Sequence, residues 1–107
     1  MSPDVKEKID SLVTSNKILV FMKGTKLMPQ CGFSNNVAQI LNSLGAPYET
    51  IDVLSDYDIR QGIKEYSNWP TIPQVYINGE FIGGSDIMIE LYQNGKLQEM
   101  VEVALAS

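Results

Sequence analysis

The residue of this sequence whose type and position best suit a reactive site is Cys31. It is the only cysteine among 107 residues, and the chain has no histidine. Without an imidazole, a Ser-His-Asp triad, a Cys-His dyad and a histidine metal site are all excluded. With one cysteine, an internal disulfide and a four-cysteine metal site within one chain are excluded as well. Among the sites built from cysteine or histidine, only one with a single thiol remains possible within one chain.

The position of Cys31 favours a reactive thiol. Residues Ile18–Met22 are continuously apolar, which predicts a central strand covered on both faces. Cys31 follows the loop after this strand and directly precedes a predicted helix, whose free amides would stabilise a thiolate. Lys23 and Lys26 add positive charge nearby. A lone cysteine is more often an inert buried residue, but this position predicts an accessible thiolate of low pKa.

Apolar residues at helical spacing predict the helices that surround this strand. Ser2 is the predicted N-cap of a first helix over residues 3 to 15. The helix that follows Cys31 ends at Gly45. Ser55 and Asp58 resemble a capping box at the start of a third helix. Two more helices lie beyond Gly84 and are separated at Gly95; their apolar residues are Ile87, Leu91, Leu97, Val101 and Leu105.

Three further strands are predicted. Residues 48–53 form the second strand, and the helix between it and the first implies a right-handed crossover with parallel pairing. Residues 74–77 and 80–82 flank Asn78-Gly79, a dipeptide that fits the positive φ angles of a type I′ hairpin turn. The predicted fold is therefore an α/β sandwich with a mixed sheet of about four strands flanked by helices.

Charge and composition exclude several partners. The net charge is −5, and the positive residues form no patch that would neutralise a nucleic-acid backbone. Residues 80–107 carry five acids and one lysine, whereas residues 23–64 carry four charges of each sign, so an anion site is expected mid-chain. The longest apolar run has five residues, too few for a membrane span. With no predicted signal or transit peptide, we expect a reducing, cytoplasmic compartment or the similar interior of an organelle.

Four motifs resemble those of monothiol glutaredoxins of the CGFS class. They occur in the family's order and cover nearly the whole chain: Lys23-Gly24-Thr25, Cys31-Gly32-Phe33-Ser34, Trp69-Pro70-Thr71-Ile72-Pro73 and Gly83-Gly84. The resemblance implies a thioredoxin fold formed by a single glutaredoxin domain over residues 1–107. It also implies glutathione binding and the transfer of a [2Fe–2S] cluster to apo iron–sulfur proteins.

The implied cluster needs more ligands than one chain offers. A [2Fe–2S] cluster takes four ligands, most often thiolates, and this chain supplies only Cys31. If two glutathione molecules supply two thiols, a cluster that bridges a homodimer through both Cys31 residues has its full ligand set. The family often pairs with small BolA-type proteins, so such a protein is a further expected partner.

The resemblance places three cations near the glycine carboxylate of glutathione: Lys23, Arg60 and Lys64. Arg60 is the strongest candidate because it is the only arginine and its planar fork suits a carboxylate. Each cation also fits a solvated surface charge. Phe33 and Thr71 are expected to form walls of the site.

Two other parts of the glutathione site follow from the resemblance. The Ile72–Pro73 bond is the family's candidate cis peptide, which leaves the main chain of Ile72 free to pair with the ligand's cysteine. Amides at Gly84 and Ser85 would hold the γ-glutamyl carboxylate, while Asp86 accepts from its ammonium group. A turn with an N-cap is an equally good interpretation of that segment. Trp69 is either a core anchor or part of the site.

Ser85 stands where many members of the class carry a second cysteine, which argues against an intramolecular disulfide but not against cluster binding. The main alternative function is an enzyme, a glutathione-dependent oxidoreductase that removes glutathione from protein mixed disulfides. Such enzymes commonly have a Cys-Pro-Tyr-Cys site and a shorter preceding loop, whereas this chain has Gly32 and a long segment over residues 23–30. We therefore expect at most weak oxidoreductase activity. A structural adaptor that does not use Cys31 is the third possibility.

Overall fold

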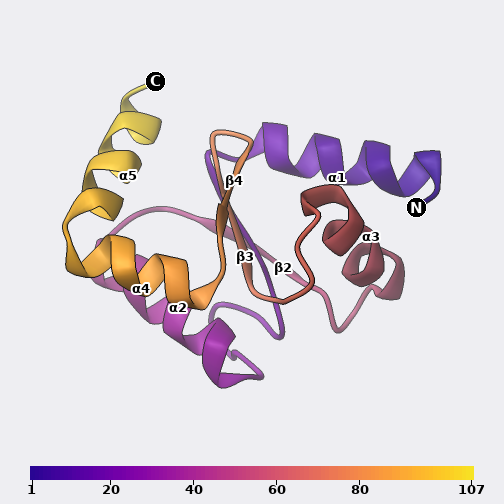
Figure 1. The fold of residues 1–107 in the computed structure, drawn as a ribbon, viewed down its shortest axis with the longest axis horizontal. Helices are drawn as coiled ribbons and strands as arrows, with labels where there is room; N and C mark the ends of the chain where they lie inside the picture. Colours follow the sequence, from indigo (N-terminus) through magenta and orange to yellow (C-terminus); the bar gives the residue numbers. More distant parts are fainter.

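Strand β1 (Ile18–Met22) lies in the middle of the fold, and all five of its residues are buried. A computed structural model describes residues 1–107 and shows the strand between two layers of helices (Figure 1). Leu19 and Phe21 face one hydrophobic core, and the three residues that alternate with them face the other. The continuous apolar run therefore serves both faces of the sheet, as the sequence predicts.

The sheet has four strands in the order β2-β1-β3-β4, and the mixed sheet predicted from the sequence is confirmed. The strands β2, β3 and β4 are Glu49–Asp52, Gln74–Ile77 and Glu80–Gly83. β1 pairs with β2 in parallel and with β3 antiparallel, and β3 pairs antiparallel with β4. The hairpin turn has φ angles of 52° at Asn78 and 79° at Gly79, the left-handed values that a type I′ turn requires.

Five helices cover the sheet. Their bounds are α1 Pro3–Ser15, α2 Gly32–Ser43, α3 Tyr57–Ser67, α4 Ser85–Gln93 and α5 Lys96–Ala106. α1 and α3 pack on one face, where their apolar residues join those of Leu19 and Phe21. The other three helices cover the opposite face (Figure 1). The arrangement is the thioredoxin fold that the resemblance implies.

Helices α1 and α3 approach closely at Gly62. A Cβ atom at this glycine would lie 2.6 Å from the Cγ1 atom of Val5, so a larger residue does not fit without movement. An ion pair of 3.1 Å between Lys8 and Asp56 joins α1 to the residue before α3. Arg60 and Lys64 lie on the opposite side of α3 from Gly62, because 100° per residue separates them from it by about half a turn.

Two predicted helix ends are confirmed. The hydroxyl of Ser2 accepts a hydrogen bond of 3.2 Å from the amide of Val5, as expected for an N-cap. Gly45 follows α2 with a φ of 66°, a conformation that favours glycine. Cys31 itself is the residue that caps the start of α2.

The predicted capping box of α3 is wrong by one residue. Asp56 is the N-cap, and its carboxylate accepts from the amide of Ile59 at 3.1 Å. The hydroxyl of Ser55 instead donates to the carbonyl of Asp52 at 2.8 Å. Both residue types suit an N-cap. The hydroxyl of Ser55 is already engaged in the turn after β2, so Asp56 caps the helix.

Three other expectations need correction. The second strand is shorter than residues 48–53, since only 49–52 pair with β1. Leu105 is 38% exposed, and Ala104 takes the core position on α5 with 1% exposure. Ile87 is 39% exposed, and Met88 is the buried apolar residue at that turn of α4. In both helices the side chain that reaches the core is one position away from the predicted one.

Candidate functional site

The Cys31 side chain is half-buried at the start of helix α2. Its sulfur accepts a hydrogen bond of 3.4 Å from the amide of Ser34, one of the free amides at the helix start. The Ser34 hydroxyl lies 3.4 Å from the same sulfur. The structure thus places the thiol at a helix N-terminus, as predicted.

The pKa of the Cys31 thiol is lowered from its ordinary value. Partial burial raises it, but hydrogen bonds from the Ser34 hydroxyl and from the amides of Ser34 and Phe33 more than offset that effect, and the charge of Lys23 adds to them. These interactions favour the thiolate, which is both the nucleophile and the metal ligand. The predicted thiolate of low pKa therefore agrees with the geometry.

Ser34 is a functional residue that the sequence reasoning did not single out. It is fully buried, and its hydroxyl accepts from the amide of Lys23 at 3.1 Å while it also meets the Cys31 sulfur. This hydroxyl therefore links the end of β1 to the thiol. The spacing between Cys31 and Ser34 could have indicated this contact. A residue three positions after the N-cap lies on the same side of the helix as the N-cap.

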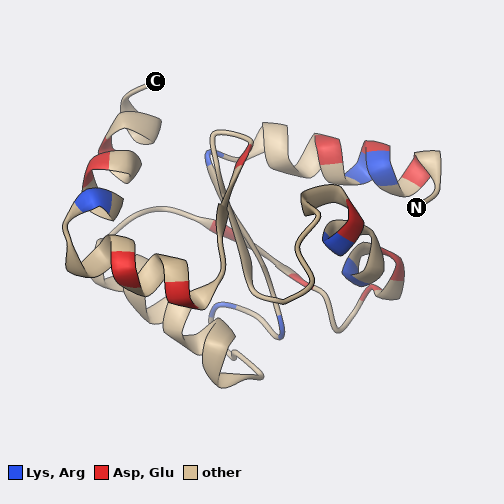
Figure 2. Ribbon diagram, viewed as in Figure 1, with Lys and Arg blue, Asp and Glu red and all other residues tan.

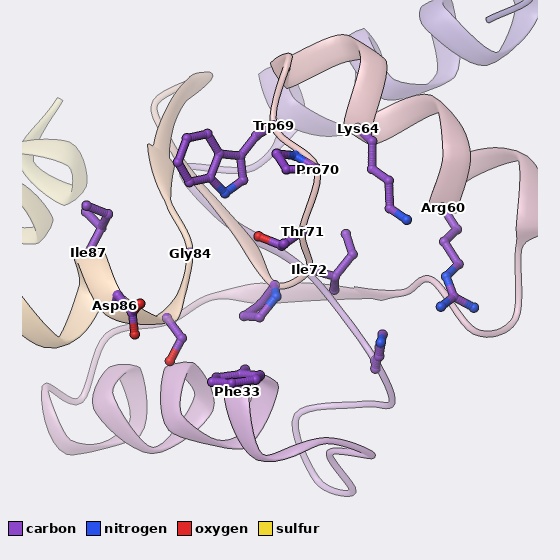
Figure 3. Close-up of a pocket in the computed structure, with 13 residues that line it drawn as sticks. Phe33, Arg60, Lys64, Trp69, Pro70, Thr71, Ile72, Gly84, Asp86 and Ile87 are labelled. Carbon is purple, nitrogen blue, oxygen red and sulfur yellow. The ribbon is translucent and has the colours of Figure 1, made fainter.

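A cavity of about 430 Å³ lies near the start of α2. Its lining contains every one of the predicted glutathione-site residues: Lys23, Phe33, Arg60, Lys64, Thr71, Ile72, Pro73, Gly84, Ser85 and Asp86. They come from distant parts of the chain and meet where the loops leave the sheet (Figure 3). Cys31 is not itself a lining residue, but it lies two residues before Phe33 and is linked to Lys23 through the Ser34 hydroxyl, and both of these residues line the cavity.

The cavity carries opposite charges at its two ends. Arg60 and Lys64 extend from α3 on one side, and Asp86 lies at the start of α4 on the other (Figure 3). The Nε atom of Arg60 is buried and has no hydrogen-bond partner within the chain. A buried donor without a partner is uncommon in proteins, because desolvation costs free energy. The Nε atom of Arg60 is therefore available to donate a hydrogen bond to an acceptor on a bound ligand.

The segment between α3 and β3 forms one wall of the cavity. The peptide bond between Ile72 and Pro73 is cis, as predicted. The main-chain amide and carbonyl of Ile72 make no hydrogen bond within the chain. Trp69 lines the cavity and is 43% exposed, so it is not a buried core anchor. Its ring instead packs against Phe81 at a centroid distance of 6.1 Å.

The start of α4 forms the acidic end of the cavity. Gly84 occupies the N-cap position without a side-chain hydrogen bond, so the expected side-chain cap is absent there. The first hydrogen bond of the helix runs from the amide of Met88 to the carbonyl of Gly84, which leaves the three preceding amides free. Ser85 is nearly buried, and its hydroxyl meets the side-chain amide of Asn36 at 3.4 Å.

Two residues of the cavity were not predicted. Pro70 lies in the wall next to Trp69, and Ile87 faces the cavity instead of the core. Ile87 is the same residue that was assigned to the apolar face of α4. Its side chain packs against Gly83, where a Cβ atom would lie 2.7 Å from the Cβ atom of Ile87.

The loop over residues 23–30 is held by contacts within it and by hydrogen bonds to neighbouring segments. An isolated bridge joins Gly24 to Pro29, and the carboxylate of Asp52 accepts from the amide of Gly24 at 2.9 Å. The ammonium group of Lys26 donates to the carbonyl of Tyr48 at 2.7 Å and lies 4.9 Å from the centre of its ring. Lys26 is thus committed to the loop, whereas Lys23 lines the cavity.

The charge distribution agrees with an anion site in the middle of the chain. Lys23, Arg60 and Lys64 line the cavity. Helices α4 and α5 carry mainly acids (Figure 2). No helix of the structure combines the length and the apolar character that crossing a membrane requires. No group of three or more cysteine and acidic side chains is arranged to hold a metal ion.

Comparison with known proteins gives a consistent family. The glutaredoxin family model matches residues 18–82. A Synechocystis protein described as an uncharacterised monothiol glutaredoxin is 80% identical over 107 residues, which span 100% of both chains. A chloroplastic monothiol glutaredoxin of Oryza sativa is 54% identical, and this chain covers 64% of its length while matching over 100% of its own.

Solved structures give the same result. The solution structure of reduced apo GrxS14 from poplar matches with a TM-score of 0.86 and 57% identity, covering 99% of this chain and 97% of that one. A buckwheat glutaredoxin in complex with glutathione matches with a TM-score of 0.84 and 32% identity, covering 94% and 90%. The cavity, the thiol and these relatives together show that the chain belongs to the glutaredoxin family, as a monothiol member with a glutaredoxin-type redox function.

Proposed function

We propose that this protein binds glutathione in the cavity and carries a [2Fe–2S] cluster, which it transfers to apo iron–sulfur proteins. The observation that carries the proposal is the cavity beside Cys31, with cations at one end and a carboxylate at the other. The related buckwheat glutaredoxin, solved with glutathione, supports the ligand.

The charges of the cavity fit the charges of glutathione. The tripeptide has a carboxylate at its glycine end and both an ammonium group and a carboxylate at its γ-glutamyl end. Arg60 and Lys64 would pair with the glycine carboxylate, and the buried Nε atom of Arg60 would gain an acceptor. Asp86 would accept from the ammonium group, and the free amides at the start of α4 would hold the γ-glutamyl carboxylate.

The middle of the ligand would lie along the wall formed by residues 69–73. The main chain of Ile72 makes no hydrogen bond within the chain, so its amide and carbonyl are available to the ligand's cysteine residue. This pairing would direct the glutathione sulfur toward Cys31. Phe33 and Thr71 would enclose the ligand from two sides.

The cluster is the cargo of the proposed reaction. Cys31 offers one half-buried thiolate of lowered pKa, the form of cysteine that binds iron. One thiolate from each of two chains and one from each of two glutathione molecules would complete the four ligands. Two of the four ligands would then be exchangeable, which suits a protein that releases its cargo.

Anaerobic reconstitution tests this proposal. The reduced protein is incubated with iron, sulfide and glutathione, and its visible absorption and sedimentation are measured. We expect a [2Fe–2S] chromophore that depends on glutathione, a dimer with the cluster and a monomer without it. Cys31→Ser should keep the circular dichroism of the wild type and lose the chromophore. A variant that still assembled the cluster, or equal masses for both forms, would contradict the proposal.

A second candidate function is glutathione-dependent reduction, and the lowered pKa of Cys31 favours it. The Cys31 thiolate would attack the glutathione sulfur of a protein mixed disulfide, and the protein thiolate would leave. A glutathione thiolate would then attack the Cys31 mixed disulfide, releasing oxidised glutathione and restoring the Cys31 thiolate. No second cysteine is available for an internal disulfide, so each turnover would need that external thiol.

The proposed partners and compartment follow from the same function. Apo iron–sulfur proteins would receive the cluster, and a small BolA-type protein would be an additional partner. A reducing compartment keeps a lone thiol available. The chloroplastic relative from rice supports the interior of an organelle or the comparable interior of a bacterial cell as the setting.

A further inference from the structure

Gln74 is a fully buried polar side chain behind the cavity wall, at the first position of β3. Its amide nitrogen donates to the carbonyl of Trp69 at 3.1 Å and to the carbonyl of Thr71 at 3.2 Å. Its amide oxygen accepts from the hydroxyl of Tyr76 at 3.3 Å. Both amide hydrogens and the oxygen therefore have partners, as a buried amide requires.

The two carbonyls that Gln74 binds belong to the wall of the glutathione cavity. Residues 69–73 all line this cavity and lie between α3 and β3, in neither a helix nor a strand. The only other hydrogen bonds of their main chain come from the amide of Trp69, which donates to the Lys64 carbonyl and the Ser67 hydroxyl. Apart from the bonds donated by the Trp69 amide, every hydrogen bond from the protein to the main chain of the wall comes from Gln74.

Tyr76 holds the oxygen end of the Gln74 amide. It is buried, and burial is the main reason that its pKa is raised to about 12, so its hydroxyl keeps its proton and can donate. The two wall carbonyls can only accept, so the amide nitrogen of Gln74 must face them and its oxygen faces the Tyr76 hydroxyl. Both residues lie on β3, so the rigid sheet positions the wall from behind.

We propose that Gln74 is a positioning residue, which holds the wall over residues 69–73 at the distance that presents the Ile72 main chain to glutathione. This inference rests on the proposed glutathione binding. Gln74 does not line the cavity and does not touch the ligand; it acts through the two carbonyls it binds.

Gln74→Met tests the inference, because methionine has a similar length and supplies no amide hydrogens. The first measurement needs no ligand: Trp69 is the only tryptophan and lies in the wall, so its fluorescence reports the wall directly. We expect emission at longer wavelength and faster hydrogen exchange at the Trp69 amide, the one amide of this wall that donates a hydrogen bond within the chain. The second measurement is an NMR titration with glutathione, for which we expect a loss of affinity of about tenfold.

Two further variants separate positioning from general stability. Val101→Ala opens the core on the opposite face of the sheet, and we expect it to lower the unfolding midpoint without changing Trp69 emission or glutathione affinity. Tyr76→Phe keeps Gln74 but removes the hydrogen bond to its oxygen. It should shift the Trp69 emission and the glutathione affinity in the same direction as Gln74→Met, but by a smaller amount. If Gln74→Met does not fold, Tyr76→Phe takes its place in both measurements.

The proposal is overturned if Gln74→Met keeps the wild-type emission and binds glutathione within about twofold of the wild type. It is also overturned if Val101→Ala weakens binding as much as Gln74→Met at equal loss of stability. If the wild type itself does not bind glutathione, the proposed function fails. The emission and exchange measurements then still show whether Gln74 holds the wall.

Discussion

The Cys31 sulfur lies 3.4 Å from the hydroxyl oxygen of Ser34, a buried group that already accepts from the amide of Lys23. Because that hydrogen bond uses a lone pair of the hydroxyl, its proton is free to be donated to the sulfur when Cys31 is a thiolate. The residue that anchors the end of β1 thus also stabilises the charged form of the thiol.

Ser34→Ala should raise the pKa of Cys31, since the variant loses the hydrogen bond from the hydroxyl to the thiolate. The rate of alkylation by iodoacetamide as a function of pH measures this change, and the midpoint should move to higher pH. Ser43→Ala removes a hydroxyl at the other end of the same helix and is the control. Equal midpoints for Ser34→Ala and the wild type would exclude the proposed role.

The lowered pKa of Cys31 also predicts a dependence of stability on pH. A thiol whose pKa is lower in the folded chain stabilises that state fully above the pKa of the unfolded thiol. This contribution decreases as the pH falls and is lost below the folded pKa. Denaturant unfolding of the wild type and of Cys31→Ser at several pH values should show the difference between them shrinking toward acid pH. A constant difference would count against a stabilised thiolate.

Arg60→Ala and Lys64→Ala should each weaken glutathione binding. A hydrogen bond to a charged group contributes about 1.5–3 kcal/mol, which is an upper limit for these partly shielded cations. Titration calorimetry with glutathione measures the loss, and Lys96→Ala on α5, outside the cavity, is the control. If Arg60 and Lys64 are only solvated surface charges, all three variants will bind like the wild type.

A comparison of two activities separates the carrier from the enzyme. The protein loaded with a cluster should pass it to an apo ferredoxin faster than free iron and sulfide rebuild one, even with a chelator present. The same preparation should reduce glutathionylated substrates slowly, because no second cysteine resolves the mixed disulfide. Fast reduction together with chelator-sensitive cluster loss would favour the oxidoreductase instead.

Asp56→Ala should destabilise the protein by about 1 kcal/mol, because it removes the N-cap of α3. Thermal unfolding measures the effect. Ser55→Ala is the matched control, since its hydroxyl bonds the β2 turn and does not cap the helix. A larger loss for Ser55→Ala than for Asp56→Ala would restore the capping box first predicted at Ser55.

The sequence was sufficient to predict the order of the elements and most of the cavity lining. The apolar run of β1, the Asn78-Gly79 turn and the glycine after α2 each have a local cause, so each could be recognised from neighbouring residues. The lining of the cavity was recognised differently, through the motifs that the chain shares with monothiol glutaredoxins. Their roles in ligand binding stay predictions until binding is measured.

What the sequence could not predict depends on contacts between distant segments. Gln74 is a polar residue beside a proline, and only the fold brings the two carbonyls of the wall and the Tyr76 hydroxyl to its amide. Ile87 fits the apolar periodicity of α4, but it lines the cavity, and Met88 is the residue buried in the core. Leu105 and Ala104 are both apolar neighbours, and the packing of α5 determines which one is buried.

The close contact at Gly62 makes helix α3 a spacer between α1 and the ligand cavity. A Cβ atom at this position would lie 2.6 Å from the Cγ1 atom of Val5, so an alanine requires the Val5 side chain or one of the two helices to shift. Arg60 and Lys64 project from the other side of α3 and line the cavity, so any shift of the helix itself would move both cations. The smallest side chain in α3 therefore lets this helix lie close against α1, on the side opposite the two cations, although it does not line the cavity itself.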